Sequence, residues 1–124
     1  MTSRPLRARR TSLAVPGSSV RMLEKSKTLN TDQVFLDLED AVAPDAKVTA
    51  RTNVVSALNE GGYGSRVRTV RINAVDTEWA SDDLSTVVRD AGSSLDCIML
   101  PKVRTVADVY WLVSRYRLKM HSVW

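Results

Sequence analysis

The chain has 124 residues, of which 44% are apolar and 26% are charged, and its formal net charge is +4. This composition is typical of a globular protein and excludes a disordered or fibrous chain. No apolar run approaches the roughly 18 residues that cross a bilayer, so we expect no membrane span and no membrane partner. The single cysteine, Cys97, excludes an internal disulfide framework, and we expect a cytoplasmic location.

Positive charge is concentrated near the amino terminus, and we divide the chain into a basic tail, residues 1–10, and a domain, residues 11–124. A basic tail can bind nucleic acid, but no nucleic-acid-binding motif accompanies this one. Aromatic residues, which stack on bases, make up only 6% of the chain. We therefore expect a solvated tail and no nucleic-acid partner. The arginines of the tail are Arg4, Arg7, Arg9 and Arg10.

The domain begins with a predicted strand over residues 12–15, which a Pro-Gly turn ends. Ser18 or Ser19 then provides the N-cap of a helix that is expected to stop by Asn30. The apolar residues expected near one face of this helix are Met22, Leu23 and Leu29.

Residues 33–38 form an apolar run with β-branched and aromatic members, which predicts a second strand. Pro44 and Asp45 open a second helix, and a pair of glycines starting at Gly61 closes it with a left-handed C-cap. Residues at helical spacing mark the buried face of this helix: Ala50, Val54, Val55 and Leu58.

Residues 67–72 predict a third strand, and a polar loop over residues 73–80 follows it. Ser81 is expected to cap a helix that ends before Gly92, and residues 97–100 predict a fourth strand. The inward residues of the third helix are expected to be Leu84, Val87 and Val88.

The last predicted helix begins at a capping box, with Thr105 as the N-cap and Asp108 as the acidic residue three positions later. Its inward stripe is expected to consist of Val109, Leu112, Val113 and Tyr116. The alternation of strands and helices implies an α/β fold with parallel strands and right-handed crossovers. Two architectures fit: a doubly wound sheet, and the first half of a (β/α)₈ TIM barrel, of which the chain supplies about four βα units.

Charged side chains follow the ends of these strands, where either architecture gathers its ligands. Asp37, Glu39 and Asp40 end the second strand, Arg71 ends the third, and Lys102 follows the fourth. An arginine near the end of a buried strand needs a carboxylate or an anionic ligand as a partner. The alternative is a purely structural salt bridge, which explains the charge balance but not the clustering at one rim.

Other candidate sites have weaker support in the sequence. Asp82 and Asp83 are interpreted as a helix N-terminus whose charges complement the helix dipole. His121 is the only histidine and lies at the carboxyl-terminal end, which argues against histidine-based catalysis. No GxGxxG or Walker A pattern is present, so neither fingerprint of nucleotide binding is met.

Four segments carry a resemblance to a known family: RTSLAVPGSSVRMLEKS, VFLDLEDAVAPDAK, VRINAVDT and IMLPKV, which together span residues 10–108. They resemble the citrate lyase beta-subunit group of the HpcH/HpaI aldolase family, which includes malyl-CoA and citramalyl-CoA lyases. The resemblance implies a TIM barrel that oligomerises and binds Mg²⁺. It implies cleavage of a carbon–carbon bond in a 3-hydroxyacyl thioester of CoA or of an acyl carrier protein. The products would be a keto acid such as oxaloacetate and an acetyl-type thioester.

The resemblance also implies roles for individual residues. Arg71, Asp37 and Glu39 are the expected catalytic residues. The expected metal ligands, a Glu and an Asp of later strands, would lie downstream, and none is expected within this chain. The residues expected to bind substrate, with Lys25 contacting the CoA portion, are Arg71, Lys25, Pro16, Gly17, Lys102 and Asp40.

The match to the family fades after about Asp108, and we expect a shortened family member. Its inherited function would be that of a Mg²⁺-dependent carbon–carbon lyase. The first alternative is a catalytically inactive homologue that binds a thioester or associates with a full-length partner. The second is an unrelated doubly wound binding module.

Overall fold

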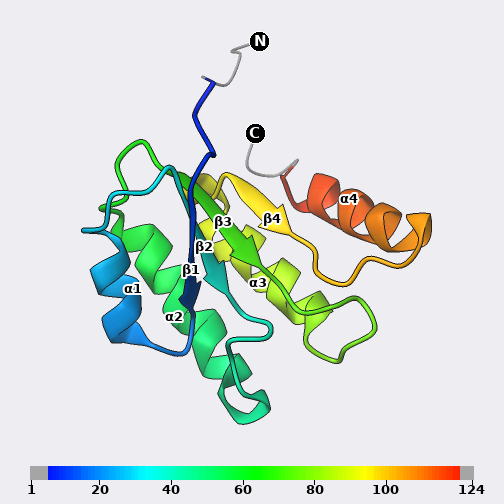
Figure 1. Cartoon of the computed structure of the whole chain (residues 1–124). Coiled ribbons are helices and arrows are strands. Elements are labelled where there is room, and N and C mark those ends of the chain that lie inside the picture. The colour runs from blue at the N-terminus through cyan, green and yellow to red at the C-terminus, as the bar shows by residue number, and fades with distance from the viewer. Residues whose placement is uncertain (1–5, 121–124) are drawn as a thin grey trace.

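The computed structural model describes residues 6–120, with side chains to residue 116, as a parallel sheet whose strands alternate with helices (Figure 1). Two short 3₁₀ turns, Pro44–Ala46 and Gly92–Ser94, flank the second and third helices. The strands are β1 Ser12–Pro16, β2 Gln33–Asp37, β3 Val67–Arg71 and β4 Cys97–Met99; the helices are α1 Val20–Ser26, α2 Lys47–Glu60, α3 Ala80–Ala91 and α4 Val106–Met120.

The strands lie in the sheet in the order β1-β2-β3-β4, and every adjacent pair is parallel. The helices pack in the same sequence, with α1 against α2, α2 against α3, and α3 against α4. A doubly wound sheet reverses its strand order at a switch point, whereas a (β/α)₈ barrel adds each strand on the same side of the last. The observed order therefore decides between the two predicted architectures and has the arrangement of a partial barrel.

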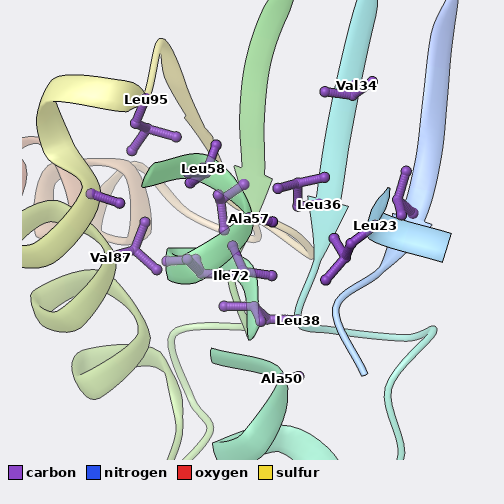
Figure 2. Close-up of a cluster of buried hydrophobic side chains, with 14 of the residues drawn as sticks. Leu23, Val34, Leu36, Leu38, Ala50, Ala57, Leu58, Ile72, Val87 and Leu95 are labelled. Carbon is purple, nitrogen blue, oxygen red and sulfur yellow. The ribbon is translucent and has the colours of Figure 1, made fainter. Parts of the chain in front are cut away.

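One face of the sheet packs against the helices and forms the hydrophobic core (Figure 2). Alternate residues of β2 and the residue after it point to this side, and Val34, Leu36 and Leu38 are fully buried. Figure 2 shows them together with Ile72 and with Val87 of α3 in the layer between strands and helices. The apolar residues of the predicted strand that face the helices are therefore the ones that the core buries.

The other face of the sheet corresponds to the interior of a barrel. The strand register aligns Pro16, Asp37, Arg71 and Met99 in one row at the carboxyl ends. A second row, one pleat earlier, consists of Ala14, Phe35, Thr69 and Cys97. Ala14 is exposed, and Phe35, Cys97 and Met99 are only half-buried, so this face is partly open.

Helix α1 is shorter than predicted and buries a different set of residues. Ser19 caps it by accepting a hydrogen bond from the Met22 N–H at 3.2 Å, as one of the two predictions had it. The helix ends at Ser26, not near Asn30, and the side chain of Met22 is 54% exposed. Leu23 and Ser26, three positions apart, form the buried face, and they leave Met22 and Leu29 outside.

The ends of the other helices differ from prediction in detail. Gly61 has the expected positive φ of 75°, but its ψ of −153° is extended rather than left-handed helical. Ser81 does not cap α3, because the helix already begins at Ala80 and its N-cap position is Trp79. Asp108 accepts hydrogen bonds from the N–H groups of Arg104 and Thr105, which confirms the acidic half of the predicted capping box.

Helix α4 is rotated relative to the predicted stripe. Leu112 and Tyr116 pack against the core as expected, together with Trp111. Val109 and Val113 are exposed, so their predicted burial is wrong. The reason is that α4 has α3 on one side and no further helix on the other among the described elements.

At the amino ends of the strands, the described part of the basic tail makes ion pairs. Arg7 donates to both carboxylate oxygens of Asp96, at 2.6 and 3.2 Å, and Arg68 donates to the same carboxylate at 3.1 Å. Arg10 pairs with Asp32 at 3.3 Å. Arg7 and Arg10 are therefore held by ion pairs, whereas the sequence predicted that the tail is solvated. No helix in the part of the chain described by the structure is long and apolar enough to cross a membrane.

The carboxylate of Asp96 predicts a pH-dependent component of stability. Burial raises its pKa, but the hydrogen bonds from Arg7 and Arg68 outweigh burial and lower the pKa from 3.8 to about 2. A carboxyl group with a lowered pKa stabilises the fold above about pH 4, and this contribution is lost as the pH falls toward 2. Asp96→Asn is expected to lower the free energy of unfolding by about 1–2 kcal/mol at neutral pH. Urea unfolding at several pH values should show the difference from wild type shrinking below pH 4; a constant difference would contradict this account.

Candidate active site at the carboxyl ends of the strands

An ion pair between β2 and β3 forms the centre of the site. The register places Asp37 directly beside Arg71, and both side chains point to the barrel-interior face. Nε of Arg71 donates to Oδ1 of Asp37 at 2.8 Å, and Nη2 donates to Oδ2 at 2.7 Å. The side chain of Asp37 is fully buried, and that of Arg71 is 24% exposed. This two-pronged geometry fixes the plane of the guanidinium.

The carboxylate of Asp37 is fully occupied by donors. Oδ1 also accepts from the N–H of Glu39, and Oδ2 from the N–H of Ala41, both at 2.9 Å. Burial raises the pKa of Asp37, but these hydrogen bonds, led by those from Arg71, hold it below its usual value. The same pair raises the pKa of Arg71. Asp37 is therefore an anchor for Arg71 and for the turn that follows β2.

The guanidinium of Arg71 keeps one nitrogen available. Nε and Nη2 point at Asp37, while Nη1 makes no hydrogen bond within residues 6–116. The ring of Phe35 lies 5.3 Å from the guanidinium carbon and supports its other surface. The head group is thus held by Asp37 and Phe35 and stays partly exposed, with Nη1 outside the contact with Asp37.

Glu39, Asp40 and Lys102 lie beside this pair, as the sequence predicted. Nζ of Lys102 is 2.7 Å from Oε2 of Glu39 and 3.0 Å from Oδ1 of Asp40. Glu39 is also 3.6 Å from Nε of Arg71. The ion pairs with Glu39 and Asp40 raise the pKa of Lys102. Lys102 has a positive φ of 52°, a backbone conformation that lysine rarely adopts. The placement of its side chain therefore costs some backbone strain.

A buried lysine that the sequence analysis missed supports the acidic turn. Nζ of Lys47 donates to the carbonyl oxygens of Leu38 and Glu39, at 3.0 and 2.9 Å, and lies 5.1 Å from the ring centre of Trp79. Burial lowers its pKa. Lys47 is the first residue of α2, where a cation opposes the helix dipole. A lysine in the first turn of a predicted helix was the sequence feature that could have pointed to this buried residue.

Asp83 was missed for a different reason. It was interpreted only as a charge that complements the dipole at a helix N-terminus, but its side chain is fully buried and paired. Oδ2 accepts from the backbone and side-chain nitrogens of Asn73, at 3.0 and 2.6 Å, and Oδ1 pairs with Arg51 at 2.9 Å. This network holds the loop after β3 and therefore the end of the strand that carries Arg71.

A pocket of about 280 Å³ opens between the loops that follow β2 and β3. The turn that carries Glu39 and Asp40, the two lysines that contact this turn, and the loop after β3 all contribute to its walls. Its lining includes Glu39, Asp40, Lys47, Asn73, Trp79 and Lys102.

The remaining predicted residues lie around β1, away from the acidic turn. Gly17 donates its N–H to the carbonyl oxygen of Asp37 at 2.8 Å, and Asn53 donates to the carbonyl of Gly17. Lys25 lies in the last turn of α1 and shares a shallow apolar pocket of about 150 Å³ with Pro16. The structure thus brings Arg71, Asp37, Glu39, Asp40 and Lys102 together and places Lys25 apart from them, in the pocket beside β1.

Comparison with known proteins identifies the family. The sequence profile described as HpcH/HpaI aldolase/citrate lyase matches residues 10–121. The chain belongs to this family. The match continues past Asp108, so the expectation that the resemblance fades there is wrong.

Relatives in the aldolase/citrate lyase family are similar over most of this chain. A (3S)-malyl-CoA thioesterase of Cereibacter sphaeroides is 46% identical over 100 residues, which are 81% of this chain and 34% of the relative. An L-malyl-CoA/beta-methylmalyl-CoA lyase of the same species is 44% identical over 106 residues, 86% of this chain and 33% of the relative. The chain therefore spans about a third of the length of the curated relatives that it matches.

Solved structures of the family confirm the fold. CitE of Mycobacterium tuberculosis in complex with magnesium, acetoacetate and coenzyme A superimposes with a TM-score of 0.63 at 28% identity, over 82% of this chain and 35% of CitE. CitE of the same species in complex with magnesium and pyruvate superimposes with a TM-score of 0.64 at 31% identity. The match covers 82% of this chain and 39% of that CitE chain. The expected α/β fold of a partial TIM barrel is thereby confirmed.

The carboxylates of the described region are mostly engaged with other side chains and backbone groups. No group of three or more His, Cys, Asp or Glu residues in that region is arranged to hold a metal ion. Both oxygens of Asp37 already accept two hydrogen bonds each, and Glu39 is paired with Lys102 and Arg71. Asp40, whose side chain is 66% exposed and pairs with Lys102 through Oδ1, is the most accessible carboxylate of this cluster.

Asp37→Asn tests the central anchor. The amide keeps the shape of the carboxylate but turns an N–H toward one of the donors and removes the charge opposite Arg71. We expect the free energy of unfolding to fall by about 3 kcal/mol. The control is Asp40→Asn, whose solvent-exposed pair with Lys102 should contribute little to stability. Denaturant unfolding measures both; equal losses would show that Asp37 is not an anchor.

Gly17→Ala tests the close approach of β1 to β2. An added Cβ would lie 2.8 Å from the carbonyl oxygen of Asp37 and 2.8 Å from Cγ2 of Val54. The carbonyl belongs to the backbone and cannot move aside, so we expect a loss of about 1–3 kcal/mol in thermal or urea unfolding. Ser18→Ala, at the exposed neighbouring position, should leave stability nearly unchanged. A stable Gly17→Ala variant would show that the glycine is not needed for packing.

Proposed function

We propose that this chain carries the substrate-binding rim of a Mg²⁺-dependent carbon–carbon lyase of the citrate lyase beta type. The substrate would be a 3-hydroxyacyl thioester such as citryl-, malyl- or citramalyl-CoA, or the corresponding carrier-protein thioester. The observation that carries the proposal is Arg71, whose guanidinium is fixed by a buried carboxylate while Nη1 stays available at the rim. The kinship with malyl-CoA and beta-methylmalyl-CoA enzymes supports the same substrate class.

The reaction explains why a preorganised cation is needed. When the carbon–carbon bond breaks, the 3-hydroxyl group loses its proton and its carbon becomes the carbonyl of the keto acid. The bonding electrons move onto the thioester as an enolate, which takes up a proton to give the acetyl-type thioester. Negative charge is present on the substrate carboxylate throughout and grows on oxygen during cleavage. A fixed guanidinium binds such an anion without reorganising, which is worth about 3 kcal/mol of the barrier. Arg71 is therefore proposed as the residue that contacts the substrate.

The other residues of the rim receive supporting roles in this proposal. Asp37 positions Arg71, because its four hydrogen bonds leave it no capacity for proton transfer. Glu39, buried between Arg71 and Lys102, sets the spacing of the two cations, and Asp40 holds Lys102 from outside. Pro16 and Gly17 shape the wall at the end of β1, and Lys25 is proposed to contact the thioester carrier.

Magnesium is bound in the CitE complexes and is proposed as the cofactor here. In this proposal its ligands come from outside the described residues, since the carboxylates of the rim are engaged. Cytoplasmic location and homo-oligomerisation stay predictions.

A second candidate function is non-catalytic: binding of a thioester or pairing with a full-length relative. The observation behind it is that Asp37 and Glu39, the carboxylates beside Arg71, are both engaged in ion pairs within the described residues. This candidate shares the anion-binding role of Arg71 but not the bond cleavage.

The experiment incubates the purified chain with citryl-, malyl- and citramalyl-CoA and Mg²⁺ and follows keto-acid release. Arg71→Ala is expected to lower kcat/KM by a factor of about 10²–10³, and EDTA to abolish turnover. Arg71→Lys should restore little, because an ammonium cannot form the paired contact with Asp37. The control is Arg89→Ala, at an exposed position that pairs only with its neighbour Asp90.

Binding of the same thioesters, measured by calorimetry, separates the two candidates. Binding that depends on Arg71 without keto-acid release favours the non-catalytic function. Thioester binding unchanged in Arg71→Ala would overturn both.

A further inference from the structure

Helix α2 contacts the loops after three consecutive strands through polar side chains of its first two turns. These side chains belong to Lys47, Arg51 and Asn53. Lys47 and Arg51 are four positions apart and therefore lie on the same side of the helix. In the row of helices, α2 has α1 on one side and α3 on the other (Figure 1). It is therefore placed to act on several strand ends at once.

Lys47 holds the backbone that carries Asp37. Its Nζ donates to the carbonyl oxygen of Leu38 at 3.0 Å, and the N–H of Glu39 donates to Oδ1 of Asp37 at 2.9 Å. This carbonyl and this N–H belong to one planar peptide group, so Lys47 and Asp37 hold the same peptide from its two sides. The N–H of Leu38 in turn donates to the carbonyl oxygen of Arg71 at 2.9 Å. Lys47 is thus linked through a single residue to both members of the central ion pair.

Arg51 acts on the other side of the pair, beyond Arg71. Its Nε and Nη2 lie 3.0 and 2.9 Å from Oδ1 of Asp83. The second oxygen of that carboxylate accepts from the backbone and side-chain nitrogens of Asn73, which follows Arg71 by two residues. The side chain of Asp83 has no exposed surface, and that of Arg51 is 11% exposed. The buried pair between α2 and α3 therefore fixes the backbone just after Arg71.

Asn53 reaches the remaining neighbour of Asp37. Its side-chain amide donates to the carbonyl oxygen of Gly17 at 3.1 Å, and the N–H of Gly17 donates to the carbonyl oxygen of Asp37 at 2.8 Å. This contact ties the turn after β1 to the same helix. The three polar residues of α2 thus act on three successive strand ends.

A purely stabilising role does not explain the lysine. Its side chain is buried at the start of a helix, where the helix dipole opposes a cation, and it makes no ion pair among the described residues. An apolar side chain would be buried there at lower cost. The charge is explained by the two carbonyl groups that it holds in the turn after β2.

We propose that Lys47 and Arg51 are positioning residues for Arg71, which hold the Asp37–Arg71 pair from helix α2 on the side of each strand. Loss of either residue would leave the fold intact and let the guanidinium change its orientation. The proposal rests on the proposed function only where it treats Arg71 as the substrate contact. The orientation of Arg71 itself is tested without substrate.

The first test is site-resolved hydrogen exchange, measured by NMR on the purified chain. Lys47→Met keeps the length of the side chain but removes its donors. Exchange at the N–H of Glu39 and at the Nε–H of Arg71 should become about tenfold faster or more. Arg51→Met should accelerate exchange at the N–H of Asn73 and at the same Nε–H by a similar factor. Amides of the strands away from the rim should keep their wild-type rates.

Leu58→Ala is the matched control, because Leu58 is buried on the same helix but in its last turn. It lowers global stability, so exchange of the slowest amides should rise by one common factor throughout the core, without a further increase at the rim. Circular dichroism verifies that each variant is folded. Lys47→Arg, which keeps the charge and the N–H donors, is the milder variant at this position and should retain most of the protection at the rim.

Binding of malyl-CoA, measured by calorimetry, relates this orientation to the substrate. Lys47→Met is expected to weaken binding by about tenfold, because a displaced guanidinium meets the anion less well. Lys47→Arg should weaken it less. A wild-type chain that does not bind the thioester would overturn the proposed function, whereas the exchange measurement decides the positioning roles by itself.

Two results would contradict the positioning roles. Unchanged protection of the rim in Lys47→Met and in Arg51→Met would show that both residues only tie α2 to the sheet. An increase by nothing more than the common factor seen in Leu58→Ala would have the same meaning. If the wild type binds the thioester through Arg71, an unchanged affinity of Lys47→Met would show that this support does not matter to the substrate.

Discussion

The salt bridge between Asp37 and Arg71 is the interaction on which the rim of this protein depends. A carboxylate with no exposed surface is costly unless every lone pair is used, and here two oxygens accept four hydrogen bonds. Two of the donors are backbone groups of the turn after β2, and two come from the next strand. The same bonds therefore shape the turn, fix its position against β3 and orient the guanidinium.

The surrounding charges extend this arrangement around the rim. Lys47 holds the acidic turn from below through two carbonyl oxygens, and Asp83 holds the loop after β3 through Asn73. Lys102 reaches Glu39 and Asp40 from the loop after β4. Three consecutive strand ends are thus tied together by side chains, and these contacts fix the orientation of Arg71. This preorganisation is what the family relationship to CoA-ester lyases leads one to expect at the carboxyl ends of the strands.

The two faces of the sheet differ in how completely they are buried. The helix-facing side is closed by leucine, isoleucine and valine side chains, whereas the interior side keeps half-buried residues and two strand edges. The amino ends are held by arginines that bridge Asp96 and Asp32. The elements are therefore anchored at both ends of the strands.

The sequence by itself determined the alternation of strands and helices, the cap at Ser19, the acidic half of the box at Asp108, and the proximity of Asp37 to Arg71. These features follow from local patterns and from the parallel pairing of strands, which brings their carboxyl ends together. Tertiary structure alone decided the strand order that selects a partial barrel, because local periodicity does not encode which strand lies beside which. It also decided that Lys47 and Asp83 are buried partners, and that Met22, Val109 and Val113 are exposed. Burial depends on which neighbours an element has, and among the described elements α1 packs against α2, and α4 against α3, as their main helical neighbours.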